Sequence, residues 1–112
     1  MENAIIINGE KYVRELSTDL NKVIIRTYSA GVHFGELKRR DGKEVELINA
    51  RRLWYWSGAA SLSQMALSGV SKPKECKFSV IVPKIILTEA IEIITCMQEA
   101  VISIEGVPVW KV

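Results

Sequence analysis

Residues 22–56 read KVIIRTYSAGVHFGELKRRDGKEVELINARRLWYW, and this stretch decides the fold. β-Branched and aromatic residues recur along it, as they do in strands, and turn-forming residues interrupt it. Gly31 can supply a positive φ, and Asp41-Gly42 is typical of a type I′ hairpin turn. The pattern predicts antiparallel strands over 22–28, 32–37, 44–48 and 51–56, with residues 38–43 as a charged turn.

The segment before this stretch predicts one further hairpin. Residues 4–7 favour a strand, Asn8-Gly9 is a turn signal, and residues 11–14 can pair back on that strand. Residues 17–21 are then a polar connection.

Two short helices are predicted in the C-terminal half. Ser61 and Gln64 form a capping-box pattern at the start of a helix over 61–68, which Gly69 and Pro73 end.

The second helix repeats this pattern. Thr95 and Gln98 form another capping box, the apolar positions 97, 100, 101 and 104 share one helical face, and Gly106 ends the helix.

Between the helices lie further strand candidates. Residues 78–82 alternate as a strand that Pro83 interrupts, as at a sheet edge or bulge. Residues 85–94 fit either a strand or a helix whose face holds Leu87, Ala90, Ile91 and Ile94. We favour a strand because six of these residues are Ile or Thr.

These elements predict one domain over residues 1–112 with an α+β fold: an antiparallel β-meander or sheet with two short helices in the C-terminal half. The apolar tail, residues 107–110, is expected to dock on its own core or on a neighbouring subunit.

Composition excludes several classes of function. Net charge is only +2, which is too weak to indicate bulk DNA binding. With one histidine and no C-x-x-C pair, we expect no metal site and no cofactor, and Cys76 and Cys96 are expected to be reduced and buried. No apolar run is long enough for a membrane span, and the basic region of a signal peptide is missing, so a cytoplasmic protein is expected.

The densest cluster of candidate binding residues is Asn49-Ala50-Arg51-Arg52-Leu53-Trp54-Tyr55-Trp56. Alternation along a strand puts Arg52, Trp54 and Trp56 on one side and Arg51, Leu53 and Tyr55 on the other. Guanidinium groups bind phosphate with paired hydrogen bonds, and flat rings stack on bases. The alternative is that the tryptophans belong to the core and the arginine stems cover them.

A second cluster surrounds the turn at residues 29–31. Its Ser-Ala-Gly backbone offers open N–H groups that can form an anion-binding nest, while Arg26, Tyr28 and His33 offer charge and stacking. An ordinary solvated hairpin is the alternative.

The remaining candidates are weaker. Residues 72–77 form a basic loop, which is usually a solvated surface, and Phe78 after it can stack on a base or belong to the core. The chain has no hydrolase, P-loop, Rossmann or zinc-protease motif, so we expect no enzymatic activity and no catalytic residues. The predicted ligand-binding residues are Arg26, Tyr28, Ser29, Gly31, His33, Asn49, Arg51, Arg52, Trp54, Trp56 and Phe78.

Three motifs carry a family resemblance: YSAGVHFG at 28–35, NARRLWYWSGA at 49–59 and ILTEAIEII at 86–94. Together they resemble the Thoeris anti-defence sponges of phages and prophages, over roughly residues 22–104.

The resemblance implies a function. Such proteins bind a cyclic ADP-ribose isomer, the messenger that a bacterial TIR enzyme makes, and release it intact, and some also hold cyclic di- or trinucleotides. They are homo-oligomers, from dimers to hexamers, in the cytoplasm of the infected bacterial cell. The fold implied is a β-sheet with accompanying helices.

Two other functions remain open from the sequence. The chain can be a small phage protein-interaction module that acts on a host protein, with the apolar tail and aromatic residues as its interface. It can also be a hydrolase that degrades the messenger.

Overall fold

The computed structural model describes residues 18–111, and its side chains from residue 21 onward. The elements in chain order are β1 (Thr18–Thr27), β2 (Val32–Asp41), β3 (Glu44–Tyr55), α1 (Leu62–Ser68), the 3₁₀ turn η1 (Pro73–Glu75), β4 (Lys77–Phe78), β5 (Val82–Leu87), β6 (Ala90–Met97) and α2 (Gln98–Glu105). This is the predicted α+β fold, with two short helices in the C-terminal half. The hairpin predicted over residues 4–14 lies outside the described residues.

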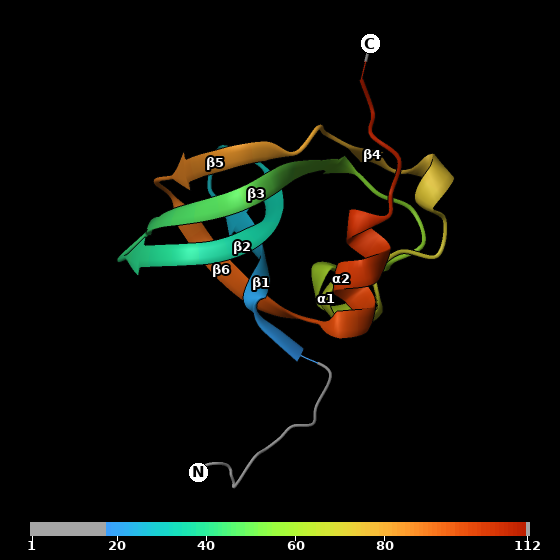
Figure 1. The fold of residues 1–112 in the computed structure, drawn as a ribbon, viewed down its shortest axis with the longest axis horizontal. Coiled ribbons are helices and arrows are strands. Elements are labelled where there is room, and N and C mark those ends of the chain that lie inside the picture. The colour runs from blue at the N-terminus through green and yellow to red at the C-terminus, as the bar shows by residue number, and fades with distance from the viewer. Residues whose placement is uncertain (1–17, 112) are drawn as a thin grey trace, which may run out of the picture.

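All pairings between the strands are antiparallel. The order across the sheet is β4-β3-β2-β1-β6, and β5 pairs with β3 on the same edge as β4. Residues 88–89 alone connect β5 to β6, although β5 pairs with β3 and β6 lies three strands further along the order. The sheet must therefore curl: β5, β3 and β2 form one layer, and β6 and β1 cross behind it (Figure 1).

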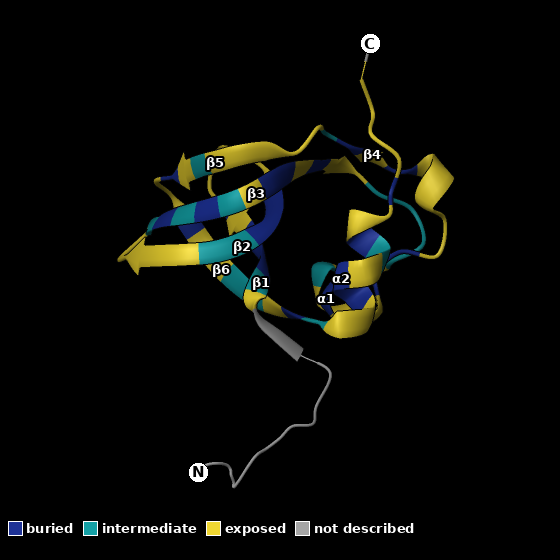
Figure 2. Cartoon of the chain, viewed as in Figure 1, coloured by how far each residue is buried: buried dark blue, intermediate teal, exposed yellow. Residues whose placement is uncertain are grey.

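The curl gives the sheet two apolar faces. Ile24, Phe34 and Leu53 face α1 and α2, where they pack with Met65 and Ile104. Figure 2 shows β2 changing from buried beside the helices to exposed at its hairpin tip.

The opposite face is enclosed by the curl. Val23 and Ile25 of β1 pack there against Val45, Leu47 and Leu87, because successive strand residues point to opposite faces.

The first helix begins and ends where the sequence predicts. Ser61 is the N-cap, and its Oγ accepts a hydrogen bond from the N–H of Gln64 at 3.1 Å. Gly69 closes the helix with φ at 80° and donates its N–H to the carbonyl oxygen of Met65 at 2.8 Å.

The second capping box was predicted wrongly. Thr95 belongs to β6, and α2 begins at Gln98 with Met97 as an N-cap that makes no side-chain hydrogen bond. Strand pairing with β1, in which Thr95 lies opposite Val23, outweighs the local capping preference.

Several strand boundaries also differ from the prediction. Residues 18–21, predicted as part of a polar connection, belong to β1 because this end of the strand also pairs with β6. Residues 38–41 continue β2, so the turn is confined to residues 42–43, and the strands predicted over 44–48 and 51–56 are the single strand β3. Residues 85–94 are extended as favoured, but Thr88 and Glu89 divide them between β5 and β6. Residues 79–81 are irregular, so Phe78 and Val82 belong to different strands.

The tail docks on its own chain. Trp110 donates its N–H to the carbonyl oxygen of Phe78 at 2.9 Å, and Val109 forms a parallel bridge with Phe78. Cys76 and Cys96 are both buried, as predicted.

No helix in the described part of the chain is long and apolar enough to cross a membrane.

Candidate functional site

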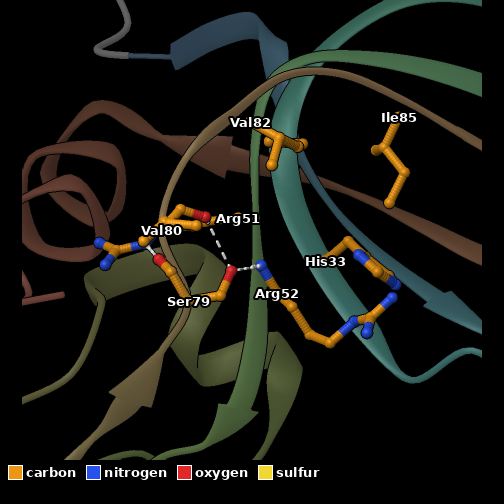
Figure 3. Close-up of a pocket in the computed structure, with 8 residues that line it drawn as sticks. His33, Arg51, Arg52, Ser79, Val80, Val82 and Ile85 are labelled. Carbon is orange, nitrogen blue, oxygen red and sulfur yellow. Dashed lines mark hydrogen bonds between the residues drawn. The ribbon is translucent and has the colours of Figure 1, made fainter. Parts of the chain in front are cut away.

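A cavity of about 260 Å³ lies beside β3, at the point where the chain passes from β4 to β5. We call it the Arg52 cavity, and Figure 3 shows its surroundings. Its lining residues are His33, Ala50, Arg51, Arg52, Ser79, Val80, Val82 and Ile85.

Neighbouring arginines leave β3 in opposite directions at this cavity. Arg51 is only 2% exposed, and Figure 3 shows its guanidinium group extending away from His33. Arg52 is exposed, and its side chain reaches toward the His33 ring. The side chains at 51 and 53 are thus buried and those at 52 and 54 exposed, which is the alternation that the sequence predicts.

The guanidinium group of Arg51 makes four hydrogen bonds within the protein. Its Nε donates to the carbonyl oxygen of Ser79 at 3.0 Å, and its Nη1 donates to those of Ile104 and Val107, both at 3.0 Å. Its Nη2 donates to the carbonyl oxygen of Phe78 at 3.4 Å. Burial lowers the pKa of Arg51. These bonds tie the end of α2 to the β4–β5 connection, so this guanidinium group is committed to the fold.

Arg52 keeps its guanidinium group available. Its backbone N–H donates to Ser79 Oγ at 2.8 Å, which holds the residue against the β4–β5 connection. No carboxylate among the described side chains forms an ion pair with it. Arg52 therefore offers an exposed cation at the mouth of the cavity.

His33 connects the cavity to the turn at residues 29–31. It is 1% exposed, lies opposite Arg52 in the β2–β3 ladder, and its Nε2–H donates to the carbonyl oxygen of Ala30 at 2.9 Å. Since a carbonyl oxygen only accepts, Nε2 carries the proton. Burial and the nearby positive charge of Arg52 lower the pKa of His33, against the opposing effect of the Ala30 hydrogen bond. The imidazole is therefore neutral at pH 7.

Hydrogen bonds within the turn at residues 29–31 occupy part of the predicted anion-binding nest. Ala30 donates its N–H to Thr27 Oγ1 at 2.8 Å, and Thr27 Oγ1 donates to the carbonyl oxygen of Gly31 at 2.7 Å. Gly31 has φ at 84°, the positive value expected of it. Ser29 Oγ donates to a carboxylate oxygen of Glu89.

Two further predicted residues on this hairpin, like Ser29 and Gly31, do not line the Arg52 cavity. Arg26 Nε donates to Glu92 Oε1 at 2.9 Å in an ion pair, and Tyr28 is 79% exposed beyond the strand end. Neither residue lines the cavity.

An aromatic stack adjoins the cavity. The rings of Trp54 and Trp110 lie 5.3 Å apart between centroids, with 20° between their planes. Lys77 Nζ lies 5.5 Å from the Trp54 centroid and 5.4 Å from that of Trp110. We call these three residues the tryptophan stack.

A second cavity joins the stack to the Arg52 cavity. It measures about 540 Å³ and is lined by Ser79, Val80, Trp110 and Lys111. Ser79 and Val80 line both cavities, so a continuous surface runs from His33 and Arg52 to the tryptophan stack.

Three other predicted residues have different surroundings. Phe78 is completely buried in the core between the sheet and the helices, and Trp56 is partly buried against the same core. Asn49 is exposed at a bulge of β3, with φ at 50°. None of the three lines the Arg52 cavity.

Of the predicted residues, His33, Arg52 and Trp54 come together on one surface, and Arg51 contributes its buried stem. The sequence prediction missed Lys77, Ser79, Val80 and Trp110. Lys77 was expected in a solvated basic loop, and Trp110 only in a docking tail. The pairing of Lys77 with Tyr55 places it beside Trp54, and sequence patterns do not reveal that pairing.

This surface supplies the chemistry of binding. It has an exposed cation and exposed indole rings, beside a hydroxyl and an imidazole whose O–H and N–H groups already donate to backbone carbonyl groups. Among the residues that the structure describes, no three His, Cys, Asp or Glu side chains are grouped so that they could hold a metal ion.

No curated protein and no solved structure matches this chain. One family model matches residues 20–104, which include most of β1, all of β2 to β6, nearly all of α2, and every predicted binding residue. The chain belongs to the DUF6948 family of domains of unknown function.

Proposed function

We propose that this protein binds a phosphate-bearing nucleotide at the Arg52 cavity and the adjoining face of Trp54, and holds it without changing it. One observation carries the proposal: the exposed guanidinium group of Arg52 lies beside a cavity, two residues from an exposed indole on the same strand face. Residues two apart on a strand are separated by about 6.6 Å. A phosphate on Arg52 and a base on Trp54 can therefore belong to one nucleotide.

The charges support an anionic ligand. Arg52 has no carboxylate partner among residues 21–111, so a phosphate does not have to displace one. Charge-assisted bonds from a planar guanidinium group to phosphate are among the stronger hydrogen bonds in proteins.

The same groups favour sequestration over catalysis. The cavity's imidazole is neutral but donates its one N–H to a backbone carbonyl, and Ser79 Oγ donates to the carbonyl oxygen of Val80 at 2.8 Å. Capture requires a slow dissociation rate rather than a general base. We therefore propose a binding protein and not an enzyme.

The resemblance to Thoeris anti-defence sponges indicates which nucleotide the protein binds. A cyclic ADP-ribose isomer carries a pyrophosphate, an adenine and ribose hydroxyls, and the surface offers a partner for each. We propose that the protein withdraws this messenger in the cytoplasm of an infected bacterial cell, and that cyclic di- or trinucleotides are further candidate ligands.

Size favours an assembly of several copies. At about 260 Å³ the Arg52 cavity falls just below the range of roughly 300–1,000 Å³ that is usual for small-molecule pockets. Tight binding of a small ligand requires a closed, preformed pocket, which a second copy of the chain would complete. We propose a homo-oligomer, from a dimer to a hexamer.

A thermal-shift screen with cyclic ADP-ribose isomers and cyclic oligonucleotides tests this function. A ligand at a thousand times its dissociation constant adds about 4 kcal/mol to the free energy of unfolding. We expect one of these ligands to raise the Tm. Arg52→Ala should remove most of that rise, whereas Arg40→Ala, which changes an exposed arginine at the far end of β2, should preserve it. If no nucleotide moves the Tm, the proposal is wrong.

A protein-interaction module is the second candidate, because large apolar side chains are exposed around the same edge. Tyr55, Val80, Ile81 and Val109 are all about half exposed. If a host protein is captured through this edge and no nucleotide shifts the melting curve, this function replaces the first.

A further inference from the structure

The small net charge of the chain conceals a strong separation of charge. Residues 50–88 contain six cationic side chains and one carboxylate, whereas residues 89–105 contain four carboxylates and no cation. A net charge of +2 therefore combines a segment at +5 with a segment at −4. Local charge rather than net charge decides which ligands a surface attracts.

Several of these cations gather around the tryptophan stack. Lys77 Nζ lies within 5.5 Å of the Trp54 centroid and 5.4 Å of the Trp110 centroid, Lys111 follows Trp110, and Arg52 is two residues from Trp54. Two more exposed lysines precede β4: Lys72 lies just before η1 and Lys74 lies within it. We call the surface of Arg52, Lys77, Lys111 and the two stacked tryptophans the basic aromatic strip.

Acidic groups do not neutralise this strip within the described chain. Glu75 is the one carboxylate between residues 50 and 88, and it accepts a hydrogen bond from Ser57 Oγ at 3.2 Å. No carboxylate among the described side chains forms an ion pair with a cation of the strip. By contrast, Glu92 and Glu105 of the acidic segment pair with Arg26 and Lys22. The strip therefore retains its positive charge.

The tryptophans add a preformed stacking platform. Trp54 is 61% exposed and Trp110 is 48% exposed, although each covers part of the other. Their mutual stacking fixes both rings before any ligand arrives, and the exposed indole surface can accept a base. Aromatic rings interleaved with cations are the usual means of binding single-stranded nucleic acid without sequence preference.

We infer that the basic aromatic strip binds a segment of single-stranded nucleic acid, with phosphates on Arg52, Lys77 and Lys111 and bases against Trp54 and Trp110. This activity goes beyond the capture of one nucleotide, because it uses Lys77, Trp110 and Lys111, which the small ligand does not require. It shares Arg52 and Trp54 with the proposed function.

Charge and geometry argue against the other occupants. Without an anionic ligand between them, two copies meeting at this strip through a twofold axis would place their cations against each other, which is unfavourable. A duplex keeps its bases stacked and paired, so they cannot reach the indole rings, whereas a single strand can turn its bases outward.

Fluorescence anisotropy with labelled twelve-nucleotide strands of oligo-dT and oligo-rU tests the inference, with a twelve-base-pair duplex for comparison. We expect both single strands to bind more tightly than the duplex. Comparing the two strands shows whether the sugar contributes. Three phosphate contacts predict a slope of about −2 for log K against log salt concentration, at about −0.7 for each contact.

Variants separate the contributions of charge and stacking. Lys77→Ala and Lys111→Ala should each reduce the magnitude of the salt slope by about 0.7. Trp110→Ala should weaken binding by about tenfold or more while the slope stays unchanged. Lys43→Ala, which removes an exposed cation at the β2–β3 turn, is the matched control and should bind as the unmodified protein does.

The outcomes distinguish this inference from the proposed function. Lys111→Ala should weaken oligonucleotide binding but retain the thermal shift with the small nucleotide, and circular dichroism verifies that this variant and Trp110→Ala fold. The inference is overturned if the duplex binds as well as the single strands, if Trp110→Ala has no effect, or if anionic lipid vesicles bind and oligonucleotides do not.

Discussion

Arg51 and Arg52 are adjacent in sequence and identical in chemistry, yet they have different roles. The first satisfies four backbone carbonyl groups from the inside, and the second presents its guanidinium group to solvent. A buried carbonyl group that loses its donor costs about 1–3 kcal/mol, whereas an exposed side chain without partners contributes little to stability.

Substitution by methionine distinguishes the two arginines. We expect Arg51→Met to lower the free energy of unfolding by about 3–5 kcal/mol, because several buried carbonyl groups lose their donor together. Arg52→Met should change it by no more than about 0.5 kcal/mol. Urea unfolding measures both, and equal losses would contradict the assignment of structural and binding roles.

His33 gives a pH dependence of stability. Because burial lowers its pKa in the folded protein, the unfolded chain binds a proton more readily as the pH falls below about 6.5. The stabilising contribution of neutral His33 is complete above that pH and is lost progressively as the pH falls toward the lower pKa of the folded state.

The measurement is urea unfolding of the unmodified protein and of His33→Gln between pH 8 and pH 5. His33 is the single histidine of the chain, and replacing it leaves every carboxylate in place. A difference between the two pH curves therefore reports on His33. We expect a steeper loss of stability in the unmodified protein just below pH 6.5. Parallel curves would mean that His33 is not buried in a neutral form.

Sequence alternation predicted which residues share a strand face, but it did not show which face is buried. It placed Arg52 with Trp54 and Arg51 with Leu53, as the structure has them. The burial of Arg51 depends on α2 and the tail, whose carbonyl groups at Ile104 and Val107 lie more than fifty residues away. Local pattern cannot reveal contacts of that range.

At the scale of elements, a bulge in β3 shapes the edge of the site. Between the pairs Phe34–Arg51 and Glu36–Ile48, β3 contains one more residue than β2. Asn49 adopts a left-handed φ of 50° there, and a Cβ on Gly35 would lie 3.1 Å from the Cα of Ala50. The bulge adds twist at the point where Arg51 and Arg52 follow.

Substitutions at Asn49 test this bulge. We expect Asn49→Gly to preserve stability, since glycine adopts a positive φ freely, and Asn49→Val to lose about 1–2 kcal/mol because a β-branched residue is strained there. Urea unfolding compares the two variants. Equal stability would show that the bulge is not held in the left-handed conformation. A normal ligand-induced Tm shift in Asn49→Gly would remove Asn49 from the predicted binding residues.

The elements were predicted well where turns have strong local signals, as at Ser61. A tight turn was also predicted correctly at Asp41-Gly42, but its type was predicted wrongly: the central residues are Gly42 and Lys43, and of the two only Gly42 has a positive φ, so the turn is not type I′. The elements were predicted poorly where tertiary pairing decides. Residues 85–94 are β-prone throughout, and they divide at Thr88 only because β5 pairs with β3 and β6 pairs with β1. Thr95 matches the sequence pattern of a helix cap, but it belongs to the pairing of β6 with β1.

For the whole molecule, the proposed closed pocket predicts self-association. Sedimentation equilibrium should give a mass between two and six times 12.6 kDa. Bound nucleotide should strengthen the assembly, because a ligand that contacts two copies favours their association. A monomer at all concentrations, with and without nucleotide, would leave the cavity open and remove the argument for tight capture.

The central claim is that Arg52 and its neighbours retain a nucleotide intact. The most direct test incubates the protein with a cyclic ADP-ribose isomer, removes unbound ligand, denatures the protein and identifies what is released by mass spectrometry. We predict recovery of the unaltered cyclic molecule from the unmodified protein and at least about tenfold less from Arg52→Ala, since a hydrogen bond to a charged group contributes roughly 1.5–3 kcal/mol. Recovery of a hydrolysed product, or of no ligand at all, would contradict the claim.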